Sequence, residues 1–84
     1  MMAERERELL DAVDLALRGD WPGAHKIAQE REGDEIANWI HAVVHRMEGD
    51  LGNARYWYRR CGRELREGVA IEAELQEIRA VLSD

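Results

Sequence analysis

Several residue types that define whole classes of protein are scarce in this chain of 84 residues. Cysteine occurs once, at Cys61, so the chain forms no internal disulfide and lacks the pattern of a small secreted, disulfide-stapled fold. No apolar run approaches the roughly 20 residues that a membrane-spanning helix needs. From Met1 to Glu8 acidic and basic residues alternate, unlike a signal or transit peptide. We therefore expect a cytoplasmic protein without a membrane segment.

Proline also occurs once, at Pro22, and the alternation of β-branched residues that is typical of strands is absent. Apolar residues instead recur at helical spacing, with charged residues on the opposite side. Gly19-Asp20 and Gly49-Asp50 interrupt this pattern, because glycine ends helices and aspartate caps the next one. We predict a single all-α domain of about five helices over residues 1–84. Its parts are an antiparallel hairpin at 3–31, a second at 35–61 and a C-terminal capping helix at 69–82.

Charge in this chain is predominantly acidic, with 18 Asp and Glu residues against 12 Lys and Arg residues and a net charge of −6. That balance argues against general nucleic-acid binding. The basic residues are nevertheless concentrated, since five arginines lie between Arg55 and Arg66 against one acid, Glu64. Arginine forks match anions well, whereas the same cluster can also be a solvated face that pairs with the chain's own acidic ends. Both interpretations stay open.

The two predicted hairpins resemble each other at an offset of 30 residues. Ala12, Val13, Gly19, Asp20 and Ala24 recur as Ala42, Val43, Gly49, Asp50 and Ala54. The chain from Leu9 to Cys61 resembles tetratricopeptide repeats, with Ala42 and Ala54 at the small positions and Tyr58 at the aromatic one. The resemblance implies antiparallel helical hairpins, although the period is 30 and His41 and His45 stand where such repeats have large apolar residues.

The second hairpin is also similar to a group of small, uncharacterised bacterial proteins. They share the pattern WIHAxxHRxEGDxxNAxYWYRR, which here runs from Trp39 to Arg60, together with Trp21 and His25 in the first hairpin. This resemblance implies a bacterial protein and brings no activity with it.

Three histidines support two different interpretations. His41 and His45 are one helical turn apart, and His25 lies on the preceding antiparallel helix, so the three can share a metal ion if His25 comes within reach of the others. The candidate metal ligands are His25, His41, His45 and Glu48. Alternatively, the histidines belong to a polar seam between helices and bond Tyr58, Asn38 or Glu48. We expect no cofactor, with zinc or another divalent metal as the alternative.

A third interpretation is a surface that contacts a ligand or partner. Its residues are His41, His45, Arg46, Asn53, Arg55, Tyr56 and Arg59. A carboxylate or phosphate would bind between imidazoles and an arginine, near the free amides at the start of the fourth helix. Tyr56 points away from the core side, and an exposed tyrosine beside arginines is typical of protein contacts. We predict a small helical protein-interaction module whose partner is another protein or a second copy of the chain in a homodimer, with binding of a small anion or metal ion as the alternative.

Catalysis would require a nucleophile or a matched acid and base. Cys61 follows several arginines, whose charge would lower its pKa, but the position better fits a small buried residue at a helix end. Glu48 and Asp50 fit a helix end and a helix cap better than a pair of catalytic carboxylates. Because one small helical domain has little room for a closed pocket, we lean against an enzyme.

Overall fold

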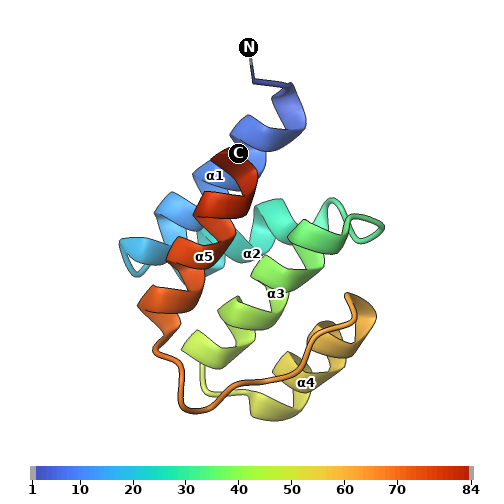
Figure 1. Ribbon diagram of the computed structural model, residues 1–84, viewed down its shortest axis with the longest axis vertical. Helices are drawn as coiled ribbons and strands as arrows, with labels where there is room; N and C mark the ends of the chain where they lie inside the picture. Colours follow the sequence, from blue (N-terminus) through green and yellow to red (C-terminus); the bar gives the residue numbers. More distant parts are fainter. Residues whose placement is uncertain (1, 84) are drawn as a thin grey trace.

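The computed structural model describes residues 2–83, which form five helices and no strand. The helices are α1 (Glu4–Leu17), α2 (Trp21–Gln29), α3 (Glu35–Met47), α4 (Leu51–Arg60) and α5 (Ile71–Ser83) (Figure 1). The prediction of an all-α fold with about five helices is confirmed. The last helix begins two residues later than predicted because Val69 belongs to the preceding loop, where its carbonyl oxygen accepts a hydrogen bond from Arg46 Nη2 at 2.9 Å.

The turn between α3 and α4 shows how local chemistry makes a hairpin. Gly49 has φ of 82°, in the left-handed region that favours glycine. This bend lets the amide of Asp50 donate to the carbonyl of His45 at 2.9 Å, which closes the end of α3. The Asp50 carboxylate then accepts from the amide of Asn53 at 3.3 Å and caps α4. Gly19, with φ of 88°, ends α1 in the same way.

Asp34 caps α3, and this contact supports a prediction about stability. Its carboxylate accepts from the amides of Ile36 at 2.9 Å and Ala37 at 3.2 Å, and it also pairs with Arg5 of α1. We expect Asp34→Ala to lower the free energy of unfolding by about 1–2 kcal/mol, because two amides of the first turn lose their acceptor. Asp34→Asn keeps the capping oxygen, so chemical denaturation should show a smaller loss. Equal losses in the two variants would contradict a capping role.

Helix α3 lies at the centre of the fold and contacts each of the other four helices. Its residues 37–45 are all buried, on every side of the helix. Asn38, His41 and His45 are therefore interior residues, not parts of a solvent-facing stripe. Helix α5 lies across α1 and α3, while α4 packs on the other side of α3 (Figure 1). None of the five helices has the length and apolar character needed to cross a membrane.

Candidate functional site

The chemically capable residues of the α3–α4 hairpin divide into two clusters on opposite sides of α3. Because a helix turns about 100° per residue, Trp39 and Arg46 share one side and His41 and His45 share the other. Trp39 and Arg46 contact α5, whereas the two histidines meet His25 of α2. The histidines of α3 and the Trp39–Arg46 pair thus belong to two separate structures.

The first structure is the histidine cluster of His25, His41 and His45. Ring centroids are 4.6 Å apart between His25 and His41, 5.5 Å between His25 and His45, and 5.0 Å between His41 and His45. Each residue offers a ring nitrogen, and these three atoms lie within 4.8 Å of one another. The fold thus brings His25 of the first hairpin next to His41 and His45 of the second. The cluster joins the two hairpins, because α2 belongs to the first and α3 to the second.

His41 is the most enclosed member of the histidine cluster, with 3% of its surface exposed. Its ring stacks on Trp57 of α4 with the centroids 3.9 Å apart. Burial lowers the pKa of His41 to about 4, and the nearby charges of His25, His45 and Arg60 act in the same direction. The imidazole is therefore neutral at pH 7, which is the form that binds metal ions. Its buried Nδ1 has no hydrogen-bond partner among residues 2–83.

His45 is oriented by a carboxylate. Its Nδ1 lies 2.6 Å from Oε1 of Glu48, three residues later on the chain. With Nδ1 engaged in this way, Nε2 is the nitrogen left to bind another group, as in the carboxylate–histidine pairs that support metal sites. Glu48 therefore contacts the histidine cluster through His45. It also lies within 4.8 Å of His45 and Asp50, measured between potential ligand atoms.

The polar-seam interpretation predicted hydrogen bonds between the histidines and Tyr58, Asn38 or Glu48. Within residues 2–83, His45 bonds Glu48, but the other two residues have different partners. The side-chain amide of Asn38 donates to the carbonyl of Glu32 at 2.8 Å, and the hydroxyl of Tyr58 donates to Glu74 of α5. The histidine cluster is consequently held by ring contacts and one carboxylate, not by a continuous hydrogen-bonded seam.

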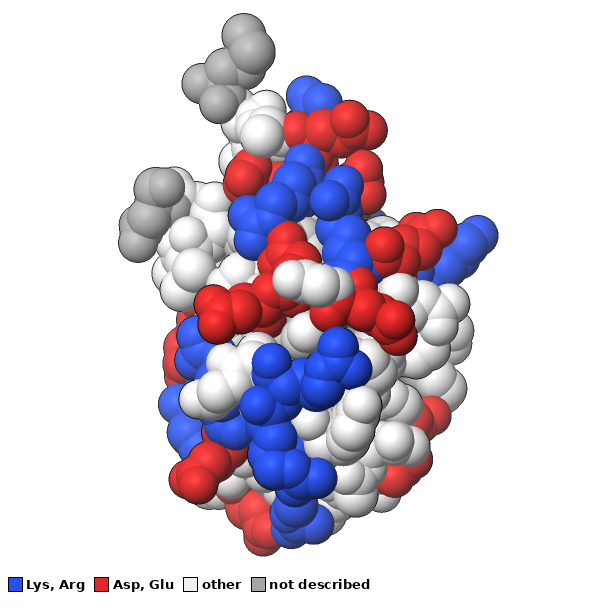
Figure 2. All heavy atoms as spheres, turned by 90° about the vertical axis from the view of Figure 1, so that its right-hand side faces the viewer, with Lys and Arg blue, Asp and Glu red and all other residues white. Residues whose placement is uncertain are grey.

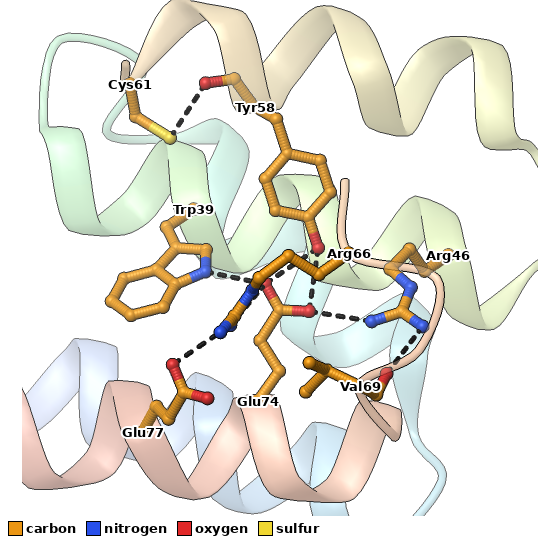
Figure 3. A network of polar contacts seen from close by, with 8 residues as sticks. All are labelled: Trp39, Arg46, Tyr58, Cys61, Arg66, Val69, Glu74 and Glu77. Carbon is orange, nitrogen blue, oxygen red and sulfur yellow. Dashed lines mark hydrogen bonds and ion pairs between the residues drawn. The ribbon is translucent and has the colours of Figure 1, made fainter. Parts of the chain in front are cut away.

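The second structure is centred on Glu74 of α5, which has only 1% of its surface exposed. Its carboxylate accepts hydrogen bonds from Trp39 Nε1, Arg46 Nη1 and the hydroxyl of Tyr58, each at 2.8 Å (Figure 3). Burial raises the pKa of Tyr58, and the hydrogen bond to Glu74 adds to this effect. The network satisfies a buried charge with two neutral donors and one guanidinium, and it anchors α5 to the second hairpin.

Sequence reasoning missed Glu74, although a signal for it was present. The apolar stripe of the last helix includes Ile71, Leu75 and Ile78, and Glu74 lies between them at helical spacing. An acid in that position must either reach solvent or find a buried partner. The partner is Arg46, whose side chain is only 10% exposed, so this arginine is not part of a surface that contacts ligands from solvent.

The remaining residues of the predicted partner surface lie along α4. Arg55, Tyr56 and Arg59 are exposed, and the structure places them away from the buried His41 and His45. The side-chain amide of Asn53 donates from Nδ2 to Asp50 Oδ2 at 2.6 Å, within the helix cap. The predicted surface therefore divides into an exposed part on α4 and the buried histidine cluster.

Cys61 ends α4 as a buried residue, with Sγ 3.3 Å from the carbonyl oxygen of Tyr58. Burial raises the pKa of the Cys61 thiol, and the opposing charge of Arg63 is the weaker effect. A buried thiol with a raised pKa is a poor nucleophile, so the arginines do not activate it.

Comparison with known proteins yields no family model, curated protein or solved structure that matches this chain. The resemblances to tetratricopeptide repeats and to small bacterial proteins stay predictions.

Proposed function

We propose that the chain binds a divalent metal ion, with zinc as the best-fitting metal, through His25, His41 and His45. The observation that carries this proposal is the convergence of three ring nitrogens within 4.8 Å from two different hairpins. Imidazole nitrogen is a preferred zinc ligand, and three histidines with one further position make a common zinc site. Cu²⁺ and Ni²⁺ also favour imidazole, so zinc is selected by the tetrahedral geometry that three such ligands allow.

Zinc would require only a modest contraction of the histidine cluster. At zinc–nitrogen distances of about 2.1 Å and tetrahedral angles, ligand nitrogens lie about 3.4 Å apart. Because the ring nitrogens lie no more than 4.8 Å apart, each distance has to shorten by at most about 1.4 Å, a difference that side-chain rotations can remove. His25 is the natural mobile ligand, because it is partly exposed while His41 and His45 are buried. Glu48 supports the site by holding the ring of His45.

An ion at this position would stabilise the contact between the two hairpins, since its ligands come from α2 and α3. Metal binding would therefore favour the folded chain over the unfolded one by mass action. We place the protein in the cytoplasm, since a chain with one cysteine lacks the internal disulfides that small secreted domains use.

Isothermal titration of chelator-treated protein with zinc tests the proposal. We expect one site with Kd in the micromolar range or below, and we expect His25→Ala to weaken it at least 100-fold. Lys26→Ala is the matched control, because Lys26 is the exposed neighbour of His25 on α2 and its loss should leave Kd within twofold. Glu48→Gln should weaken binding by about 10–100-fold through the orientation of His45.

Two outcomes would refute the metal proposal: a Kd above 100 μM, or equal zinc affinity in His25→Ala and wild type. Circular dichroism establishes that each variant is folded. His25→Cys provides a further check, because a thiolate can replace the imidazole. Cadmium added to this variant should produce a thiolate charge-transfer absorption that wild type lacks. Its absence would mean that position 25 does not reach the ion.

A further inference from the structure

The most basic surface of the molecule follows α4 and the turn after it. Its exposed arginines are Arg55, Arg59, Arg60, Arg63 and Arg66. Only Glu64 is acidic within that stretch, whereas the rest of the chain has seven of the 12 basic side chains and 17 of the 18 acidic ones. Figure 2 looks onto this side and shows Lys and Arg atoms as a continuous band, with acidic atoms at its edges. We call these five residues the arginine face.

A groove of about 290 Å³ runs along the arginine face. Its lining residues are Arg55, Arg59, Arg63, Glu64 and Leu65. Arg55 and Arg59 are one helical turn apart, so their side chains start about 6 Å from each other. Gly62, with φ of 71°, turns the chain after α4, and the amide of Arg63 donates to the carbonyl of Tyr58 at 2.8 Å. Arg63 lines the groove together with the other two arginines, and its guanidinium carbon lies 3.4 Å from the centroid of the Trp39 ring.

The arginines of this face are only lightly engaged with the chain's own acids. Within residues 2–83, two of the five have carboxylate partners: Arg55 is 3.2 Å from Glu67, and Arg66 is 2.9 Å from Glu77. The Glu67 side chain is 71% exposed. Exposed pairs of this kind contribute little free energy, so an incoming carboxylate can replace them. The solvated-face interpretation thus accounts for part of the charge. Among residues 2–83, Arg59, Arg60 and Arg63 have no carboxylate partner, and the last two lie over the rings of Trp57 and Trp39.

The surroundings of the groove suit a protein segment better than a nucleic acid. Tyr56 is 45% exposed on the same helix, and Leu65 contributes apolar surface to the groove. Tyrosine and arginine are the residue types enriched at protein interfaces. A long polyanion would also meet the acidic remainder of a chain with net charge −6, whereas a short acidic segment would contact the arginines alone.

We propose that the arginine face docks an acidic segment of a protein partner, with carboxylates about 6 Å apart held by Arg55, Arg59 and Arg63. That spacing occurs between acids one turn apart on a helix. Arginine–carboxylate pairs are strong because two parallel hydrogen bonds form in one plane. The proposal goes beyond metal binding and does not depend on it, since none of these arginines belongs to the histidine cluster.

Fluorescence anisotropy with a labelled alanine-based helical peptide tests this inference. The peptide carries three glutamates at four-residue spacing, and a single-stranded DNA oligomer of equal negative charge is measured beside it. We expect saturable peptide binding at 50 mM salt, weakened at least 10-fold by Arg59→Glu. Arg7→Glu makes the same charge change on α1, which does not contact α4, and should leave Kd within twofold.

The inference would be overturned by equal effects of Arg59→Glu and Arg7→Glu, or by absence of peptide binding at 50 mM salt. DNA binding tighter than peptide binding would also overturn it, in favour of a nucleic-acid surface. Titrations are run both in chelator and with zinc, so that failure of docking is distinguishable from failure of metal binding. Matching circular dichroism spectra of the two variants exclude misfolding, because both arginines are exposed.

Discussion

Replacing Glu74 by alanine is expected to lower the free energy of unfolding by about 3–5 kcal/mol, the effect of breaking a buried ion pair by removing one partner. The substitution leaves Arg46, with a side chain 10% exposed, next to the space where its carboxylate was. Trp39 Nε1 and the hydroxyl of Tyr58 lose their acceptor at the same time. A domain of this size has a total stability of about 5–15 kcal/mol, so the loss is a large fraction of the whole.

Thermal and chemical denaturation measure this effect, and Glu77→Ala is the matched control. Glu77 lies three residues after Glu74 on α5, is exposed and pairs with Arg66 at 2.9 Å. Its replacement should change stability by less than about 1 kcal/mol, as for other surface pairs. In a double-mutant cycle, Glu74→Ala with Arg46→Ala should be clearly less destabilising than the sum of the single changes. Equal effects at Glu74 and Glu77 would show that the buried network does not anchor α5.

Acidification of the metal-free protein is expected to remove about 2 kcal/mol of stability between pH 7 and pH 4.5 through His41 alone. The pKa of His41 is lowered from 6.5 to about 4 in the folded chain, chiefly by burial. The unfolded state therefore binds more protons in this interval, and the fold loses stability as the pH falls through it. Above about pH 7.5 the imidazole is neutral in both states and contributes almost no pH dependence.

Chemical denaturation at several pH values, with a chelator present, checks this prediction. His41→Phe keeps an aromatic ring against Trp57 and removes the titrating group, so its stability should fall by about 2 kcal/mol less than that of wild type. The Asp34 carboxyl does not interfere above pH 4.5: Arg5 lowers its pKa, and its contribution is lost only below the ordinary value of 3.8. Parallel pH profiles of wild type and His41→Phe would contradict the assignment.

Much of the fold could be predicted because its signals are local. Gly49 and Asp50 determine the turn between α3 and α4 through a positive φ and contacts that reach only a few residues along the chain. The position of α5 was not predictable in the same way. Periodicity identifies its apolar stripe, but nothing in that stripe states that the helix lies across α1 and α3.

At the candidate site, too, some features can be predicted from spacing along the chain, whereas others depend on how the helices pack. Histidines one turn apart on α3 are evident from spacing, and so is the proximity of the preceding helix. The stacking of His41 on Trp57 and its burial depend on how α4 closes over α3, and they decide that the imidazole is neutral. The buried roles of Arg46 and Glu74 also depend on packing, which the spacing of residues along the sequence does not reveal.

By itself, the sequence determined the helices, the Gly-Asp turns and the set of residues capable of chemistry, because each follows from interactions within one or two turns of chain. Only the tertiary structure decided which of those residues meet. Trp39 and Glu74 are 35 residues apart in sequence and 2.8 Å apart in space. Such encounters depend on how whole helix faces bury their apolar surface against one another, and this packing brings His25 to His41 and leaves the arginine face on α4 exposed.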